Sequence, residues 1–186
     1  MIKRFFDIMA SGLGLIILSP VLAVVLFLIW RQDRHSPFYF GERVGKNGQP
    51  FKIIKIRSMI IGADKNGVES TGAADNRITP LGHFVRRWKL DETTQLWNVL
   101  IGEMSLVGPR PNTLKAVATY SPEERSLLVA RPGMTDFSSI VFSDEGDIIK
   151  GAADPDAEYD RLIRPWKSQL GLLYVKNANA FLDIKL

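Results

Sequence analysis

The chain has 186 residues, enough for one domain with its own core, and it contains no cysteine and only two histidines. This composition excludes a disulfide framework and a thiolate metal site, and it argues against a histidine-based zinc site or a Ser-His triad. The net charge of +4 and the pI near 9.4 predict an anionic partner. The cations are spread among aromatic and aliphatic residues, which favours a membrane surface over nucleic acid.

Residues 1–31 are predicted to form a membrane anchor. Between residues 5 and 30 the only charge is Asp7, and the apolar run is long enough to span a bilayer. Ser19-Pro20 lies near its middle, where a proline removes a backbone hydrogen bond, and the positive flanks place both ends on the cytoplasmic side. We therefore expect a re-entrant helix-break-helix, with Ser19 helping to satisfy the freed carbonyls. A straight single-pass helix is the alternative.

A β-hairpin is predicted next, over residues 37–59. Two apolar strands flank Asn47-Gly48, and Asn-Gly is the strongest short-range hairpin signal. In the second strand Lys55 and Arg57 share one face. Their side chains either face solvent or bind a diphosphate.

The strongest chemical signal lies in residues 84–111, after a polar loop over residues 62–79 and a short helix over residues 81–89. Asp91 and Glu92 directly follow a cluster of three cations, at a predicted helix start. Free N–H groups and the helix dipole favour negative charge there, so we expect both carboxylates to stay ionised. The alternative is an ordinary capped helix start with no chemistry.

A stiff turn, Gly108-Pro109-Arg110-Pro111, ends this stretch. Two prolines restrict the backbone on either side of one arginine, which fixes the direction of its guanidinium. The residues by themselves therefore predict an anion site beside two carboxylates.

The rest of the chain is predicted to be mainly helical. A helix over residues 113–120 is followed by another that starts at Ser121-Pro122 and ends at Arg131-Pro132-Gly133. Residues 136–157 carry six acidic residues and glycines in a spacing unlike a calcium loop, so we expect a polar excursion. Residues 158–186 are amphipathic, and the apolar stripe suits either the lipid headgroup region or ordinary core packing.

These predictions together give an α+β, mainly helical fold. It would comprise the N-terminal re-entrant helix-break-helix, a small β-hairpin and several short and amphipathic helices. The anchor of residues 1–31 would be followed by one globular domain, residues 32–186, on the cytoplasmic face.

A longer pattern in the same stretch closely resembles the bacterial sugar transferase family, the monotopic phosphoglycosyl transferases that begin glycoconjugate assembly on a polyprenol phosphate. The matching residues are Arg86, Arg87, Leu90, Asp91, Glu92, Gln95, Leu96, Asn98, Val99, Leu100, Gly102, Glu103, Met104, Ser105, Leu106, Val107, Gly108, Pro109, Arg110 and Pro111. The resemblance extends to residues 131–135, 55–59 and the N-terminal apolar segment. The sequence departs from the family pattern at Thr94, Asp136 and His83, where proline, glycine and arginine are common. These departures bear on substrate detail more than on chemistry.

The resemblance implies transfer of a sugar 1-phosphate from a UDP-sugar to a polyprenol phosphate, expected to be undecaprenyl phosphate, at the cytoplasmic face of a bacterial inner membrane. Asp91 would be the nucleophile of an aspartyl-phosphosugar intermediate, with release of UMP, and Glu92 would position the metal or the attacking groups. Mg²⁺ is the expected metal, held by both carboxylates. Arg110 would bind phosphate, with Arg87, Lys55 and Arg57 as further candidates.

Two other classes stay open from the sequence. One is a metal-dependent phosphohydrolase at the membrane surface, which would release free sugar phosphate without a lipid acceptor. The other is a non-catalytic scaffold that binds anionic lipid through a basic amphipathic face. Nucleic acid is not an expected partner.

Overall fold

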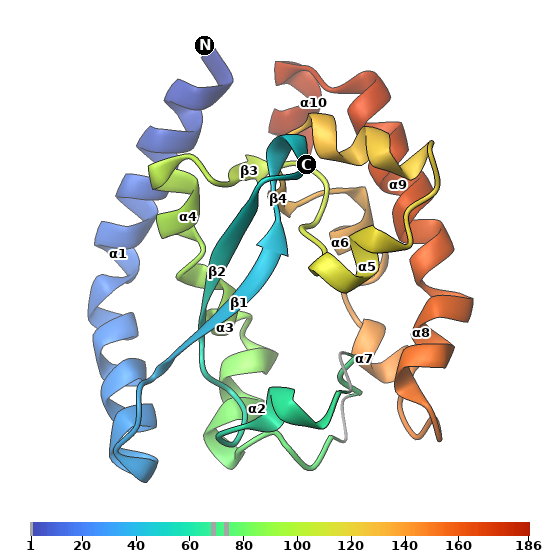
Figure 1. The fold of residues 1–186 in the computed structure, drawn as a ribbon. Helices are drawn as coiled ribbons and strands as arrows, with labels where there is room; N and C mark the ends of the chain where they lie inside the picture. Colours follow the sequence, from blue (N-terminus) through green and yellow to red (C-terminus); the bar gives the residue numbers. More distant parts are fainter. Residues whose placement is uncertain (1, 68–69, 73–74) are drawn as a thin grey trace.

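One long helix forms an edge of the molecule, and the other elements lie to one side of it (Figure 1). The structure is a computed structural model that describes residues 2–67, 70–72 and 75–186. In chain order the elements are α1 (Ile2–Asp33), β1 (Phe38–Val44), η1 (Lys46–Gly48), β2 (Pro50–Ile56), η2 (Ala63–Asn66), α2 (Pro80–Arg87), α3 (Leu90–Thr93), α4 (Leu96–Ile101), β3 (Ser105–Val107), α5 (Leu114–Ala118), η3 (Glu124–Val129), β4 (Gly133–Thr135), α6 (Phe137–Val141), α7 (Glu145–Ile148), α8 (Pro155–Leu162), α9 (Arg164–Asn177) and α10 (Ala180–Lys185), where η marks a 3₁₀-helix. The α+β, mainly helical class is confirmed.

Helix α1 continues through the proline at which the sequence predicts a break. Pro20 has no N–H for the carbonyl of Ile16, and the hydroxyl of Ser19 donates to that carbonyl instead, at 2.7 Å. The expected role of Ser19 is therefore confirmed, whereas the two separate helical legs are replaced by one helix. At about 1.5 Å per residue the helix is about 48 Å long, which exceeds a hydrocarbon core of about 30 Å.

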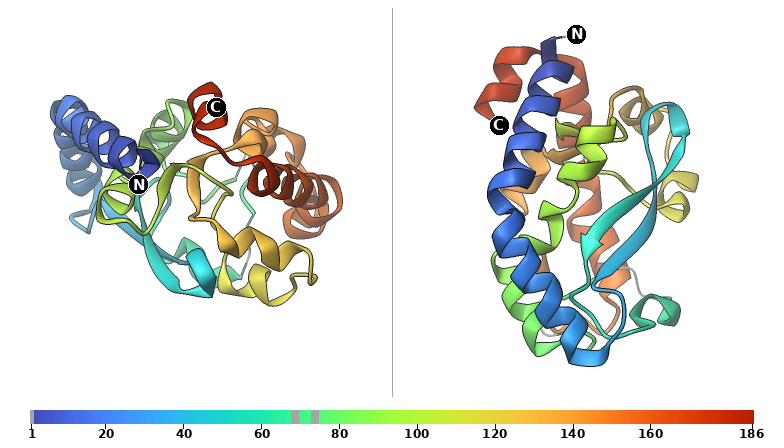
Figure 2. Two further views of the ribbon diagram at one scale, coloured as in Figure 1. Left: turned by 90° about the horizontal axis from the view of Figure 1, so that it is seen from above. Right: turned by 90° about the vertical axis from the view of Figure 1, so that its left-hand side faces the viewer.

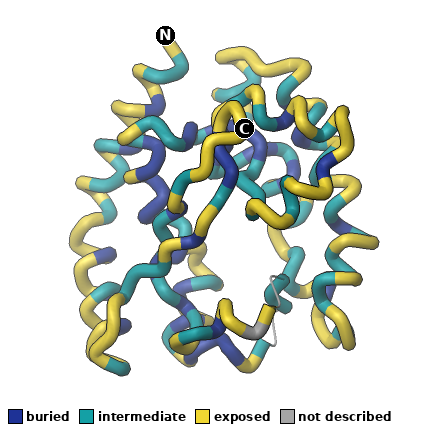
Figure 3. Tube along the Cα trace, viewed as in Figure 1, coloured by how far each residue is buried: buried dark blue, intermediate teal, exposed yellow. Residues whose placement is uncertain are grey.

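One face of α1 packs against the rest of the protein along most of its length. Its buried residues recur at a spacing of three or four within each half of the helix, and the dark segments of Figure 3 follow this stripe. Leu22, Val25 and Ile29 form a core with Ile56 of β2 and Val85 of α2. The opposite face is exposed and apolar: Phe5, Phe6, Met9, Leu13, Ile16, Ile17, Val24, Phe27 and Trp30.

Two cations hold the first turn of α1 to the domain. Lys3 Nζ lies 2.7 Å from Asp183 of α10 and donates to the hydroxyl of Tyr174 in α9, also at 2.7 Å. Arg4 donates to the carbonyl of Leu100 at the end of α4, at 2.7 Å. Because α1 is tied to the same body at its start and buried against it near its end, it does not project away as an isolated span.

The predicted hairpin is confirmed. Strands β1 and β2 pair antiparallel, from Phe38 opposite Ile56 to Val44 opposite Pro50. Asn47 and Gly48 adopt positive φ angles of 57° and 77° in the turn, a conformation that favours these two residue types.

A second, parallel pair of strands was not predicted from the sequence. Ser105 in β3 pairs with Gly133 in β4, and Val107 pairs with Thr135. A Cβ atom on Gly133 would lie 2.1 Å from the backbone nitrogen of Gly108, so only glycine permits this approach. The two strands join segments far apart in the chain at the point where the proline-arginine turn begins.

The C-terminal third is more regular than expected. The predicted polar excursion contains α6, capped by Asp136, and the short helix α7. The amphipathic stretch divides into α8, α9 and α10, and its buried side chains include Ile163 and Tyr174. Helices α8 and α9 form the edge of the molecule opposite α1 (Figure 2). Part of the predicted loop over residues 62–79, namely residues 68–69 and 73–74, lies outside the described residues.

Candidate functional site

The two carboxylates lie on α3, a single turn held against the hairpin. Lys89 precedes it in a left-handed conformation, with φ of 54°, and redirects the chain between α2 and α3. Thr94 donates to the carbonyl of Ile54 at 3.0 Å, and Asn98 accepts from the N–H of the same residue at 3.0 Å. The helix that the sequence predicts to start here is divided into two short helices, α3 and α4. Both of them lie against β2.

Glu92 is bound by two cations from distant segments. Lys55 Nζ lies 2.8 Å from Glu92 Oε1. The two terminal nitrogens of Arg110 donate hydrogen bonds to the same carboxylate, one to each of its oxygens. Burial opposes ionisation, but the charges of Arg110 and Lys55 outweigh it and hold the pKa of Glu92 well below its usual value. The predicted meeting of Glu92, Lys55 and Arg110 is thus present in the structure.

Asp91 is in the opposite electrostatic situation. Its Oδ1 atom is buried and has no hydrogen-bond partner among the described residues. Burial raises the pKa of Asp91, against the attraction of Lys55, and the negative charge of Glu92 adds to the rise. At Asp91, desolvation therefore offsets the stabilisation that the sequence predicts for a carboxylate at a helix start.

Arg87 is a phosphate-binding candidate predicted from the sequence, but the structure places the adjacent Arg86 nearer to the carboxylates. Arg87 is exposed at the end of α2. Arg86 is half-buried, donates to Ser58 Oγ at 3.1 Å, and is attracted by the charge of Asp91. A Cβ atom on Gly82, one turn earlier, would lie 1.8 Å from the carbonyl oxygen of Ser58, so only glycine permits the close approach of this face of α2 to Ser58. The geometry therefore favours Arg86 over Arg87 as the third cation of the site.

Arg57 is engaged elsewhere. Its guanidinium binds both oxygens of Asp33, the last residue of α1, with Nη2 at 2.7 Å from Oδ1. Its Nε also donates to the carbonyl of Ser36 at 2.8 Å. In the structure Arg57 therefore fastens the end of α1 to the hairpin, and only Lys55 of the predicted pair reaches the carboxylates.

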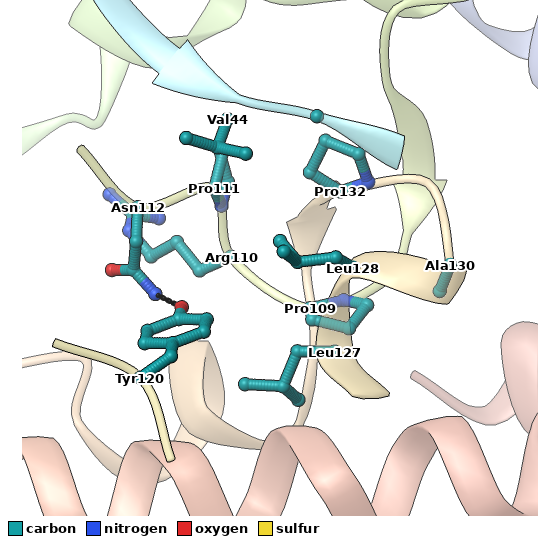
Figure 4. Close-up of a pocket in the computed structure, with 11 residues that line it drawn as sticks. Val44, Pro109, Arg110, Pro111, Asn112, Tyr120, Leu127, Leu128, Ala130 and Pro132 are labelled. Atoms are coloured by element: carbon teal, nitrogen blue, oxygen red, sulfur yellow. Dashed lines mark hydrogen bonds between the residues drawn. The ribbon is translucent and has the colours of Figure 1, made fainter. Parts of the chain in front are cut away.

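The turn that carries Arg110 is fixed from several sides (Figure 4). Gly133 N–H donates to the carbonyl of Pro109 at 2.9 Å, and Val44 N–H donates to the carbonyl of Asn112 at 3.0 Å. The cavity in Figure 4 has a volume of about 10 Å³, room for about one water molecule. The backbone contacts on either side of the turn fix the position of Arg110.

The site suits a metal that needs few protein ligands. Within the described part of the chain, no three Asp, Glu, His or Cys side chains gather as a ligand set. Mg²⁺ is typically held by one or two carboxylates together with phosphate oxygens and waters. The unpaired Asp91 Oδ1 fits such a ligand, whereas Glu92 is already occupied by Lys55 and Arg110.

Comparison with known proteins gives a consistent picture. The model of the bacterial sugar transferase family matches residues 1–186. The chain is 47% identical over 110 residues to a putative undecaprenyl-phosphate N-acetylgalactosaminyl 1-phosphate transferase of Bacillus subtilis, covering 59% of this chain and 62% of that protein. It is 32% identical over 192 residues to the UDP-glucose:undecaprenyl-phosphate glucose-1-phosphate transferase of Klebsiella pneumoniae. This match covers 99% of this chain and 38% of that protein.

A further relative is the UDP-N-acetylgalactosamine-undecaprenyl-phosphate N-acetylgalactosaminephosphotransferase of Aeromonas hydrophila. It is 31% identical over 186 residues, covering 98% of this chain and 41% of the relative. The chain thus spans less than two thirds of the length of these relatives.

Proposed function

The chain belongs to the bacterial sugar transferase family, and from this premise we propose that it transfers a sugar 1-phosphate from a UDP-sugar to undecaprenyl phosphate. The observation that carries the proposal is a buried carboxylate oxygen of Asp91 that has no partner in the described part of the chain. It lies next to Glu92, which binds Lys55 and Arg110. A desolvated carboxylate beside fixed cations is suited to attack a polyanionic phosphorus centre.

The transfer would proceed in two displacements. A carboxylate oxygen of Asp91 forms a bond to the β-phosphorus of the UDP-sugar, and the bond from that phosphorus to the bridging oxygen breaks. UMP leaves with the bonding electrons, and no proton moves. A phosphate oxygen of the lipid then attacks the same phosphorus, and Asp91 departs as a carboxylate.

The cations would supply the charge balance in both displacements. Lys55 and Arg110 converge on one carboxylate, so an incoming diphosphate competes with Glu92 for the same donors. Arg86 adds positive charge on the Asp91 side. Mg²⁺, held by Asp91 and by Glu92 once its cations engage the substrate, would neutralise charge that develops on the phosphate oxygens.

The anchor would keep the site at the lipid surface. The exposed face of α1 is apolar, and contacts near both of its ends are made with the same domain: Lys3 with Asp183, and Asp33 with Arg57. This arrangement supports a monotopic protein, because a domain bound at both ends of α1 cannot lie on two sides of a bilayer. The positive residues that flank the apolar segment favour the cytoplasmic face.

Cysteine labelling tests this topology, and the absence of native cysteine makes single-site variants clean. We expect Ile2→Cys and Arg34→Cys to react only with an impermeant thiol reagent on the cytoplasmic side. Lys150→Cys, exposed on the domain, serves as the reference. Labelling of the two ends from opposite sides would contradict the monotopic arrangement.

The activity is tested with a panel of UDP-sugars, undecaprenyl phosphate and Mg²⁺, with released UMP as the readout. A panel is needed because the names of the relatives carry different sugars. We expect UMP release that depends on the lipid, and exchange of labelled UMP into the UDP-sugar without it. Free sugar phosphate formed without lipid would instead indicate a phosphohydrolase, and membrane binding without turnover would indicate a scaffold.

A further inference from the structure

Gln95 places a buried amide donor in the segment that follows Asp91. Its side chain is almost fully buried, with 2% of the residue exposed, and its Nε2 atom has no hydrogen-bond partner among the described residues. Neighbouring buried polar side chains do have partners, since Thr94 and Asn98 both bond to Ile54 of β2. Buried polar groups in folded proteins are almost always hydrogen-bonded, so an unpaired donor next to a reactive carboxylate calls for a ligand.

The backbone places Gln95 one turn after the two carboxylates. Its N–H donates to the carbonyl of Glu92 at 3.0 Å, and its own carbonyl accepts from the N–H of Val99 at 3.0 Å. Gln95 therefore lies at the junction of α3 and α4, three residues after Glu92 and four after Asp91. The next residue, Leu96, turns instead toward α1, where its Cδ1 lies close to Gly14.

Two unpaired buried atoms of opposite character occur in this short segment: the acceptor Asp91 Oδ1 and the donor Gln95 Nε2. They do not bond to each other. A phosphoryl group satisfies both at once, because it offers an electrophilic phosphorus to the carboxylate and a non-bridging oxygen to the amide. A water molecule can bridge the same acceptor and donor in the free protein, and an oxygen of the bound phosphoryl group would take its place.

We propose that Gln95 is a catalytic residue whose Nε2 donates a hydrogen bond to a non-bridging oxygen of the phosphoryl group as it is transferred to and from Asp91. This inference rests on the proposed function. Lys55, Arg86 and Arg110 neutralise net charge, whereas Gln95 would add a neutral donor fixed by burial at the reacting phosphorus. Such a donor gains strength as charge develops on the oxygen, so it acts on the rate more than on substrate binding.

The test uses Gln95→Met in the full chain, since methionine has a similar length and no donor. We expect kcat to fall by about 10²-fold, with the KM for the UDP-sugar nearly unchanged. UMP exchange without lipid should fall by the same factor. The Tm should stay equal or rise, because the variant removes a buried unpaired amide.

Thr94→Val is the matched control from the same turn. It removes a buried hydroxyl that already has a partner, the carbonyl of Ile54. Because Thr94 also holds α3 against β2, we expect a lower Tm and a loss in kcat well below the roughly 10²-fold loss of Gln95→Met. Gln95→Glu, which retains the shape and adds a negative charge, should lower kcat at least as much as Gln95→Met.

Three results would overturn the inference: wild-type kcat and exchange in both Gln95 variants, a lower Tm with kcat intact, or a defect that excess Mg²⁺ restores fully. Failure of the proposed function looks different. Wild-type protein that turns over without any lipid-independent UMP exchange refutes the covalent route before any Gln95 variant is measured.

Discussion

Asp91→Asn should abolish turnover and UMP exchange while leaving the protein folded. Loss of a covalent nucleophile typically costs about 10⁴-fold or more in kcat. Asparagine retains the shape of the side chain and removes only the charge. Since burial raises the pKa of Asp91, the ionised form is disfavoured in the folded protein, and the neutral variant is expected to have an equal or higher Tm. Radiolabel exchange and thermal unfolding provide the two measurements.

Glu92→Gln is the neighbouring control, and its expected pattern is the reverse. It leaves Asp91 able to attack but removes the negative charge that holds Lys55 and Arg110. Loss of these charged hydrogen bonds should cost about 1–3 kcal/mol of stability, with reduced but measurable exchange. Full activity in Asp91→Asn would refute any catalytic role of Asp91. Turnover in the wild type with neither UMP exchange nor sugar phosphate trapped on Asp91 by mass spectrometry would assign Asp91 to the metal alone.

Arg110→Lys is expected to behave as a severe change despite the conserved charge. The guanidinium of Arg110 reaches both oxygens of Glu92, and the same planar fork suits two oxygens of a phosphate, which an ammonium cannot match. One charge-assisted contact of this kind contributes on the order of 2–3 kcal/mol. The kcat/KM should therefore fall by roughly 30- to 150-fold, as measured by UMP release.

Arg57→Lys provides the matched comparison, because Arg57 is also bidentate on a carboxylate but binds Asp33 at the end of α1. We expect that variant to lower the Tm and to leave kcat/KM near the wild-type value. Wild-type kinetics in Arg110→Lys would show that Arg110 is structural. A large kinetic loss in Arg57→Lys with an unchanged Tm would restore Arg57 as a phosphate ligand.

Features that depend on neighbouring residues could be predicted from the sequence. Asn47-Gly48 specified the hairpin because these residues adopt positive φ at little cost. Pro20 removed a donor and Ser19 supplied the replacement within the same turn. The acidic pair and the turn around Arg110 were recognisable because each is defined by a short run of residues, and the family pattern gave them roles.

Only the tertiary structure decided which partners these groups meet. Arg86 and Arg87 are adjacent in sequence, and burial of one face of α2 determines which of them lies near Asp91. The sequence predicts that Arg57 shares a strand face with Lys55, but β2 ends at Ile56, and Arg57 binds Asp33, 24 residues away, outside the site. Strands β3 and β4 are three residues long and are stabilised by a pairing across the chain, which no local pattern encodes. Asp91 is the clearest case: a helix start favours its charge, and the desolvation that raises its pKa arises only from the segments that cover it.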